Sequence, residues 1–380
     1  MTPSLWRWGV SVNWAGKRIA LIGPLPPPAG GIANQTRQLG ELLRAEGLDV
    51  ELVRVNAPYK PAWVRSVKGL RAGFRLVPYL MRLWAAAGRA DLMHVMANSG
   101  WSWHLFAAPA VWVAVLRGVP VVVNYRGGEA DDFLSRSARW VRPTLLRAGG
   151  VLVPSGFLRE IFSRHGVETH IVPNVVDLAR FKPASSRQGG GGAPHIVVAR
   201  NLEPIYGISV ALQAFARILA DYPQARLSVA GSGPQAGELE RLAAQLGLEG
   251  HVCFTGRLDR DEMARLYRDA DVMLNPSRVD NTPNSVLEAL ASGVPVVSTA
   301  VGGVPYIVED GRSALLVPRD DAAAMASAVT RLLRSPELRQ QLVECGRREV
   351  RRYTWTAVRD TLFAGYTAAV QNGVAPMAAR

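Results

Sequence analysis

Short apolar segments alternate with amphipathic helical segments along most of this chain, and the alternation restricts the fold more than any other feature. In the first half, the strand-like segments are 18–22, 50–55, 92–96 and 119–124, and a helical pattern covers 32–46. In the second half they are 195–199, 226–230, 252–254, 272–275 and 294–298, with helical patterns at 210–221, 236–246 and 261–269. Strands that alternate with helices form parallel sheets with helices on both faces. The sequence therefore predicts an α/β fold with two Rossmann-like parallel-sheet domains.

A glycine- and serine-rich segment separates the two halves. Residues 184–194 include Ser185, Ser186 and four consecutive glycines at 189–192, a composition typical of a flexible linker. The 380 residues of the chain are too many for one ordinary core and fit two domains of roughly 150–200 residues. We predict a first domain over 1–183, a linker at 184–194 and a second domain over 195–352.

The net charge of +13 indicates an anionic partner or substrate. Nucleic acid is the weakest candidate, because the charge is not accompanied by zinc-finger spacing, a recognition-helix pattern or aromatic RNA-binding strands. Acidic lipid and a phosphorylated substrate remain. The fraction of hydrophobic residues, 48%, excludes disorder over most of the length.

Four basic residues recur at helical spacing beside an apolar stripe. The basic residues are Arg65, Lys68, Arg71 and Arg75, and the stripe is Trp63, Val67, Leu70 and Phe74. This pattern is typical of an amphipathic helix that lies on a membrane surface or contacts an anionic acceptor. A solvated basic face above an ordinary core stripe has the same pattern, because a soluble helix also needs one apolar face. The sequence leaves both interpretations open.

We expect a cytoplasmic protein, with peripheral attachment to the inner face of the membrane left open. The longest apolar run, 105–116, contains Pro109 and is shorter than the roughly 18–20 residues that span a bilayer. The N-terminal segment lacks the pattern of a signal peptide. Cys253 and Cys345 lack metal-ligand spacing and are interpreted as buried, reduced thiols. The six histidines also show no metal spacing, so no metal site is predicted.

The segment 271–303 has the pattern of an anion site. The strand-like run 272–275 breaks at Asn275-Pro276-Ser277, and a helix restarts at Asn284 and Ser285. Free N–H groups and the positive dipole end at the start of this helix favour a phosphate. Glu288 in the first turns would then face sugar hydroxyls of the same ligand, and Asp280 on the loop supplies a second carboxylate.

This segment resembles the retaining glycosyltransferases of family 4 (glycosyltransferase group 1), which have the GT-B fold and carry a Glu-x(7)-Glu motif here. The resemblance implies that Glu288 holds the ribose of a nucleotide donor. Asp280 occupies the position of the first glutamate, which holds the donor sugar. It also implies that an N-terminal acceptor domain and a C-terminal donor domain face a cleft, and that the final helix, 353–372, returns to the first domain.

The same resemblance assigns three positions around the leaving diphosphate. Arg200, after the strand-like run 195–199, matches an arginine that holds the diphosphate, whereas Tyr206 stands where the family usually has a lysine. Arg126 stands where the family has a histidine beside the donor sugar, and we hypothesise that it supplies the second positive charge. The alternative for Arg126 is a loop ion pair with Glu129 or Asp131.

Several glycines match loops that approach the donor in this family. Gly30 and Gly31 precede the first helix, where a helix start and a lack of side chains suit an anion. The others follow strand-like runs of the second half: Gly231, Gly256, Gly302 and Gly303.

The resemblance therefore implies a metal-independent hexosyltransferase without a cofactor, which uses a nucleotide sugar as co-substrate. It would move the sugar to a hydroxyl acceptor with retention at the anomeric carbon. The acceptor expected from the basic stripe is a lipid-linked or polysaccharide-precursor glycan of the cell envelope. The departures at Asp280, Tyr206 and Arg126 motivate an alternative, a catalytically weak GT-B protein that binds sugar nucleotide or acts as a scaffold.

Overall fold

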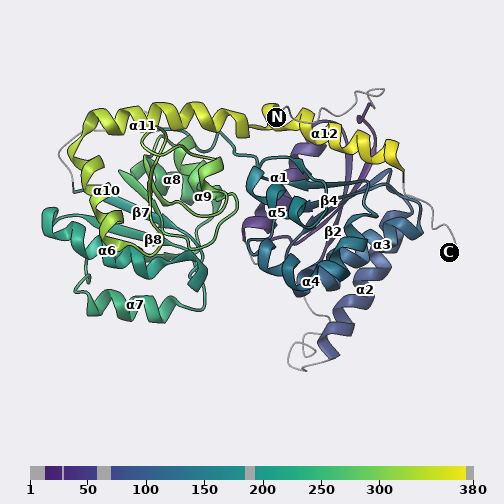
Figure 1. Ribbon diagram of the computed structural model, residues 1–380, viewed down its shortest axis with the longest axis horizontal. Helices are drawn as coiled ribbons and strands as arrows, with labels where there is room; N and C mark the ends of the chain where they lie inside the picture. The colour runs from purple at the N-terminus through teal and green to yellow at the C-terminus, as the bar shows by residue number, and fades with distance from the viewer. Residues whose placement is uncertain (1–12, 28–29, 58–69, 185–192, 374–380) are drawn as a thin grey trace. The chain divides into compact units, whose positions relative to one another are not determined.

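The computed structural model describes residues 13–27, 30–57, 70–184 and 193–373, which fold into two compact units. Unit 1 comprises Met1–Pro173 and Val358–Arg380, and unit 2 comprises Asn174–Ala357 (Figure 1). Each unit contains one six-stranded sheet in which all strand pairs are parallel. The predicted α/β fold with two parallel-sheet domains is confirmed.

Unit 1 has the strand order β2-β1-β3-β4-β5-β6. The strands are β1 (Arg18–Gly23), β2 (Asp49–Arg54), β3 (Leu92–Ala97), β4 (Val121–Tyr125), β5 (Gly150–Val153) and β6 (His170–Ile171). The two central strands, β3 and β4, are buried along their whole length, as expected for a parallel sheet covered on both faces.

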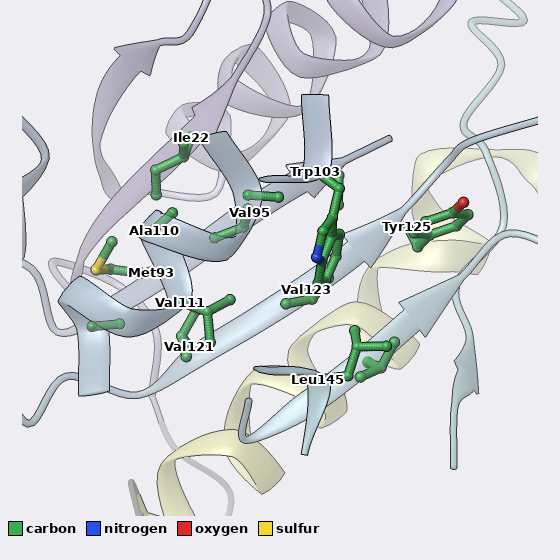
Figure 2. Packing of buried hydrophobic residues seen from close by; sticks show 14 of the residues in the cluster. Ile22, Met93, Val95, Trp103, Ala110, Val111, Val121, Val123, Tyr125 and Leu145 are labelled. Carbon is green, nitrogen blue, oxygen red and sulfur yellow. The ribbon is translucent and has the colours of Figure 1, made fainter. Parts of the chain in front are cut away.

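Helices cover both faces of the sheet in unit 1. They are α1 (Gly31–Ala45), α2 (Leu70–Ala87), α3 (Ala108–Leu116), α4 (Ala130–Leu145), α5 (Gly156–Arg164) and α12 (Trp355–Asn372), and a π-helix, η2 (Trp103–Ala107), leads into α3. One continuous core lies on the side of the sheet that α2, α3, α4 and α5 cover. In this core, Val95, Val121 and Val123 of the strands pack against Val111 and Leu145 of the helices (Figure 2). On the opposite face lie α1 and α12, because Gly40 approaches Leu21 and Gly365 approaches Leu152.

The C-terminal helix α12 belongs to unit 1 from Val358 onward, although the residues before it belong to unit 2. Val358, Leu362 and Tyr366 recur at helical spacing, which predicts one apolar face, and all three are buried. The same spacing places Val370 on this face, but its side chain is 37% exposed, so the pattern is wrong there. The chain enters unit 2 at Asn174, before the predicted linker, because Val176 and Phe181 pack in the core of that unit.

Unit 2 has the strand order β12-β11-β10-β7-β8-β9. The strands are β7 (His195–Ala199), β8 (Arg226–Ala230), β9 (Val252–Gly256), β10 (Val272–Asn275), β11 (Val296–Thr299) and β12 (Leu315–Val317). The α-helices are α6 (Ile208–Asp221), α7 (Ala236–Gln245), α8 (Arg260–Asp269), α9 (Asn284–Ala291), α10 (Ala322–Arg334) and α11 (Pro336–Glu349). Three short 3-10 helices are η3 (Pro204–Tyr206), η4 (Val304–Tyr306) and η5 (Val350–Tyr353).

Both cysteines were expected to be buried, and this expectation is wrong. Cys253 is exposed and Cys345 is partly exposed. The reason for Cys253 is topological, since β9 is the edge strand of its sheet and is covered less than the central strands. In the described residues, no helix has the length and apolarity needed to cross a bilayer.

The strand orders place a topological switch point in each sheet. In unit 2, β8 lies on one side of β7 and β10 on the other; in unit 1, β2 and β3 flank β1 in the same way. Loops leave the carboxyl ends of the two strands in opposite directions at such a point, and this opens a crevice for ligands. A ligand site is therefore expected at the loops after β7 and β10 in unit 2, or at those after β1 and β3 in unit 1.

Candidate functional site

Arg200 and Asp280 meet at the switch point of unit 2. Arg200 directly follows β7, Asp280 lies in the loop after β10, and these two strands are paired. The guanidinium Nη2 of Arg200 donates a short hydrogen bond to Asp280 Oδ2, and its Nε donates to Asn275 Oδ1 at 2.9 Å. Only 11% of the Arg200 side chain and 10% of the Asp280 side chain are exposed. The structure thus joins two predicted site residues in one buried ion pair.

Burial raises the pKa of Asp280, and the charge of Arg200 opposes this shift, together with hydrogen bonds from Ser277 and the Asn281 backbone. The positive charge of Arg200 beside it favours the ionised form of the carboxylate. Breaking a buried pair by removing one partner typically costs about 3–5 kcal/mol, because the other charge stays buried without compensation. The pair therefore fixes both side chains in the loop.

Tyr206, in the place expected for a lysine, packs against the same cation. The Arg200 guanidinium carbon lies 5.3 Å from the centre of the Tyr206 ring. The following residue, Gly207, has φ of +59°, and a Cβ there would lie 2.3 Å from the Pro276 carbonyl oxygen. A glycine is therefore required for the loop after β7 to approach the loop after β10.

The N-terminus of α9 carries polar groups that lack partners among the residues that the structure describes. Ser285 Oγ and Thr282 Oγ1 are buried and make no hydrogen bond to any residue in the described part of the chain. The N-cap residue is Pro283, so no side chain caps the helix. Asn174 Nδ2 donates to Asn284 Oδ1 at 2.7 Å and to the Thr282 carbonyl at 3.1 Å, which holds the loop in place. Buried hydroxyls at an uncapped helix start are suited to bind an anion.

Glu288 lies one turn beyond Ser285 on the same side of α9. Tyr267 of α8 donates a hydrogen bond to Glu288 Oε2 at 3.4 Å. Burial raises the pKa of Glu288 to about 7, while Arg260, the Tyr267 hydroxyl and Arg200 act in the opposite direction. The influence of Arg200 places Glu288 in the same electrostatic environment as the Arg200–Asp280 pair.

Glycines bring the surrounding loops into close contact. The Gly303 backbone N–H donates to the Asp280 carbonyl at 2.9 Å, and a Cβ at Gly303 would lie 1.7 Å from the Asn281 carbonyl oxygen. Its neighbour Gly302 has φ of +53°. Gly231 donates to the Gly256 carbonyl at 2.8 Å, and a Cβ at Gly231 would lie 1.8 Å from the Arg200 carbonyl oxygen. All four predicted glycines of unit 2 thus belong to one loop cluster around Arg200 and Asp280.

In unit 1, Arg126 follows β4 and is held by its neighbours. Its backbone N–H donates to the Ala97 carbonyl at 2.9 Å, and its Nε donates to Asn124 Oδ1 at 2.7 Å. Burial lowers the pKa of Arg126 to about 9, so that the side chain is still charged at neutral pH. A Cβ at Gly127 would lie 2.3 Å from Ser99 Oγ, which shows how closely the loops after β3 and β4 pack. Asp131, a carboxylate considered for Arg126, pairs with Arg164 at 3.5 Å.

Gly30 and Gly31 lie at the start of α1, as predicted. Gly30 is the N-cap residue and has no capping side chain. A Cβ at either glycine would meet none of the described atoms within 4 Å. Crowding by the described protein atoms therefore does not explain these glycines, and their role in donor binding stays a prediction.

The predicted basic stripe lies only partly within the described residues. Arg65 and Lys68 fall outside them, whereas Arg71 and Arg75 belong to α2. Arg75 is partly buried, and Phe74 of the adjoining apolar stripe is 43% exposed. An exposed Phe74 differs from the ordinary core stripe considered above, and the interfacial helix stays a prediction.

Sequence reasoning missed the residues that support the site. Asn275 and Tyr267 contact Arg200 and Glu288, respectively, and Asn124 contacts Arg126. Asn275 and Asn124 end or nearly end buried strands, and a polar residue at that position could have indicated them. Within the described residues, no group of three or more His, Cys, Asp or Glu side chains could hold a metal ion.

Comparisons with known proteins match both halves of the chain. A family model described as glycosyl transferases group 1 matches residues 186–349, and one described as glycosyl transferase 4-like domain matches residues 30–175. A D-inositol 3-phosphate glycosyltransferase of Acidothermus cellulolyticus is 30% identical, over 94% of this chain and 94% of the relative. A phosphatidyl-myo-inositol mannosyltransferase of Mycobacterium leprae is 28% identical, over 94% of this chain and 98% of the relative.

Solved structures match the chain over nearly its whole length. Sucrose-phosphate synthase from Thermosynechococcus elongatus matches with a TM-score of 0.75 and 24% identity, over 93% of this chain and 99% of that chain. The Anabaena protein HepE, in complex with UDP and glucose, matches with a TM-score of 0.70 and 17% identity, over 94% and 99%. At these identities the likeness shows the shared two-domain fold.

Proposed function

The chain belongs to the group 1 family of glycosyltransferases and has the GT-B fold, and we propose that it moves a sugar from a nucleotide-diphosphate donor to a hydroxyl acceptor with retention. One observation carries the proposal: the buried Arg200–Asp280 pair lies beside an uncapped helix start with two buried hydroxyls that lack described partners. A diphosphate has the charge and the oxygen acceptors that this arrangement can bind.

Each group in unit 2 has a role in this proposal. The N-terminus of α9 and Ser285 bind the diphosphate, and Glu288 accepts hydrogen bonds from the ribose hydroxyls. Arg200 neutralises the charge that develops on the leaving phosphate oxygen. Asp280 orients Arg200 and accepts a hydrogen bond from a hydroxyl of the donor sugar. Gly30 and Gly31 at the start of α1, and the glycines of unit 2, leave the backbone open to the donor.

The reaction breaks the bond between the anomeric carbon and the phosphate oxygen and forms one between that carbon and the acceptor oxygen. The acceptor proton passes to the leaving diphosphate on the same face of the sugar, so no side-chain nucleophile is used. Arg126 is the second cation of the proposed machinery. Cationic side chains then supply the charge stabilisation that a metal ion supplies in other transferases, which makes the proposed reaction independent of metal and cofactor.

We propose an anionic, lipid-linked or polysaccharide-precursor acceptor. The names of the relatives support this choice, since they contain phosphatidyl-myo-inositol and inositol 3-phosphate, both phosphorylated polyols. The net charge of +13 favours such an acceptor over a neutral one.

We expect transfer when the purified protein is given UDP-, GDP- or ADP-linked hexoses with phosphatidylinositol vesicles or inositol phosphate. The measured quantities are acceptor-dependent release of nucleoside diphosphate and the anomeric configuration of the product by NMR, with and without EDTA. Inversion at the anomeric carbon would contradict the mechanism. Donor binding without turnover over the whole panel would favour the alternative of a sugar-nucleotide-binding or scaffolding protein.

A lipid-linked acceptor requires the protein to bind a membrane surface. The proposed membrane-binding surface lies on α2, α3 and α4 of unit 1. Exposed large apolar side chains on or directly after these helices are Phe74, Val77, Met81, Trp84, Trp112, Leu116, Trp140 and Leu146. Arginines lie among the tryptophans: Arg117 is 4.9 Å from the Trp84 ring, and Arg147 is 6.0 Å from the Trp112 ring. Apolar and aromatic side chains with interspersed arginines are typical of a surface that binds anionic lipid. We propose peripheral attachment of the protein to the cytoplasmic face of the membrane through this surface.

The double substitution Met81→Ser and Trp84→Ser is expected to weaken binding to phosphatidylglycerol-containing vesicles by about 10-fold or more, because two apolar side chains no longer enter the bilayer. Cosedimentation with vesicles of stated composition measures this. Val370→Ser is the matched control, because Val370 is exposed on α12, on the other face of the sheet. Equal binding by all three proteins would exclude α2 as the attachment site.

A further inference from the structure

A chain of hydrogen bonds runs from Arg126 along one face of the sheet of unit 1 to the C-terminal helix. Arg126 Nε donates to Asn124 Oδ1 at 2.7 Å, and Asn124 Nδ2 lies 3.1 Å from His94 Nε2. His94 Nδ1 in turn lies 2.7 Å from the Tyr366 hydroxyl on α12. Asn124, His94 and Tyr366 are at most 1% exposed. We call these three side chains the relay.

The direction of every hydrogen bond in the relay follows from Arg126. A guanidinium only donates, so the Asn124 oxygen must face Arg126 and the Asn124 nitrogen must face His94. His94 Nε2 is then the acceptor, and the ring carries its proton on Nδ1, which donates to Tyr366. Burial and the charge of Arg126 lower the pKa of His94 to about 3, so this neutral form is kept at physiological pH.

The relay is an unusual feature in an otherwise apolar layer. Neighbouring positions on the same face of the sheet are Leu21, Val122 and Leu152, all fully buried. Three adjacent polar side chains under a sheet are costly unless every group is paired. In the relay, Asn124 and His94 bond each other and His94 bonds Tyr366, and the end outside the apolar layer is Arg126, which is partly exposed.

We propose that Asn124, His94 and Tyr366 are positioning residues that hold the Arg126 guanidinium in the orientation used for sugar transfer. This inference rests on the proposed role of Arg126 in the reaction. Through the relay, α12 supports the Arg126 side chain, because Tyr366 of α12 is the last hydrogen-bonding group of the chain of contacts.

Loss of the Tyr366 hydroxyl tests the relay. In Tyr366→Phe, His94 loses the acceptor for Nδ1–H. If the ring moves its proton to Nε2, the Asn124 amide must turn and present its nitrogen to Arg126, which removes the acceptor for the arginine Nε–H. Either arrangement leaves one buried donor without a partner, and the second releases Arg126.

We expect Tyr366→Phe to lower kcat by about 10-fold at temperatures well below its melting point, with little change in KM for the donor. Solvent exchange of the Arg126 Nε–H, followed by NMR on arginine-labelled protein and assigned with Arg126→Lys, should become faster. Tyr79→Phe is the matched control: Tyr79 is a buried tyrosine of the same unit, and its hydroxyl donates to the Phe106 carbonyl at 2.8 Å. It should lose comparable stability while kcat and Arg126 exchange stay unchanged.

His94→Gln and His94→Leu separate positioning from packing. The glutamine amide can accept from Asn124 and donate to Tyr366, whereas leucine does neither, so glutamine should retain more kcat than leucine. Equal loss in both variants, or a kcat loss in Tyr79→Phe equal to that in Tyr366→Phe, would overturn the relay. Unchanged Arg126 exchange in Tyr366→Phe would overturn it as well.

The exchange measurement needs no turnover, so it separates the relay from the proposed function. If Arg126→Ala transfers sugar normally, the role of Arg126 is wrong and the relay has no part in catalysis. Faster Arg126 exchange in Tyr366→Phe would then still show that the relay holds the side chain.

Discussion

Replacing Arg200 by alanine is expected to lower kcat by about 100- to 1,000-fold, the largest functional loss of any single substitution in unit 2. The reason is that a preorganised cation at the leaving diphosphate acts mainly in the transition state, where the phosphate oxygen gains charge. KM for the donor should rise less than kcat falls. Steady-state kinetics with a saturating acceptor measure both quantities.

Arg200→Ala also removes the partner of Asp280, so its stability must be measured beside its activity. The uncompensated carboxylate is expected to cost about 3–5 kcal/mol of unfolding free energy, read from denaturant titrations. Arg200→Lys keeps a charge but cannot bond both Asn275 and Asp280, and it should fold with kcat reduced about 10-fold. Arg334→Ala is the control, because Arg334 forms an exposed ion pair with Asp221 at 2.9 Å and should change neither quantity measurably. A folded Arg200→Lys or Arg200→Ala variant with normal kcat would show that Arg200 does not stabilise the leaving group.

The fold was predictable because most strands are apolar runs of at least four residues, each separated from the next by a helical pattern. The predicted runs 195–199, 226–230 and 272–275 coincide with β7, β8 and β10. The three strands without a prediction are β5, β6 and β12, of which β6 and β12 have only 2 and 3 residues. Segments of two or three residues carry too little pattern to differ from loops, and their place in the sheet is fixed by pairing with a neighbouring strand.

The candidate site was predicted residue by residue, but not as an arrangement. Arg200 and Asp280 were assigned separate roles, on the diphosphate and on the sugar, whereas the structure pairs them across a separation of 80 residues. Only the pairing of β7 with β10 brings them together, and a sequence pattern does not encode which strands are neighbours. The relay was missed for the same reason, since His94 and Tyr366 are 272 residues apart.

The second large effect is expected for Glu288→Gln, which should bind nucleoside diphosphate about 10- to 100-fold more weakly than the unchanged protein at pH 8. A carboxylate accepts hydrogen bonds from two ribose hydroxyls with the help of its charge, whereas the amide is neutral and offers one acceptor. Since the pKa of Glu288 is raised to about 7, binding by the unchanged protein should weaken as the pH falls from 8 to 6. Calorimetric titration with UDP, GDP or ADP measures this. The diphosphate itself also titrates near pH 6, so the Glu288→Gln protein supplies the reference curve over the same range.

Glu288→Gln should also make the protein more stable at pH 8, which distinguishes it from a substitution that weakens binding by destabilising the fold. Burial holds the folded-state pKa of Glu288 above its ordinary value of 4.5, so the folded protein binds more protons than the unfolded chain between these two values. The contribution of this group to stability is therefore present at low pH and is lost as the pH rises through about 7. Glu288→Gln avoids the cost of burying the charge and should raise the unfolding free energy at pH 8 by up to about 3 kcal/mol, with little difference at pH 5.

Glu240→Gln, an exposed change on α7, should alter neither binding nor stability. If Glu288→Gln binds the nucleotide as tightly as the unchanged protein and melts at the same temperature at pH 8, Glu288 is neither the ribose acceptor nor a buried charge.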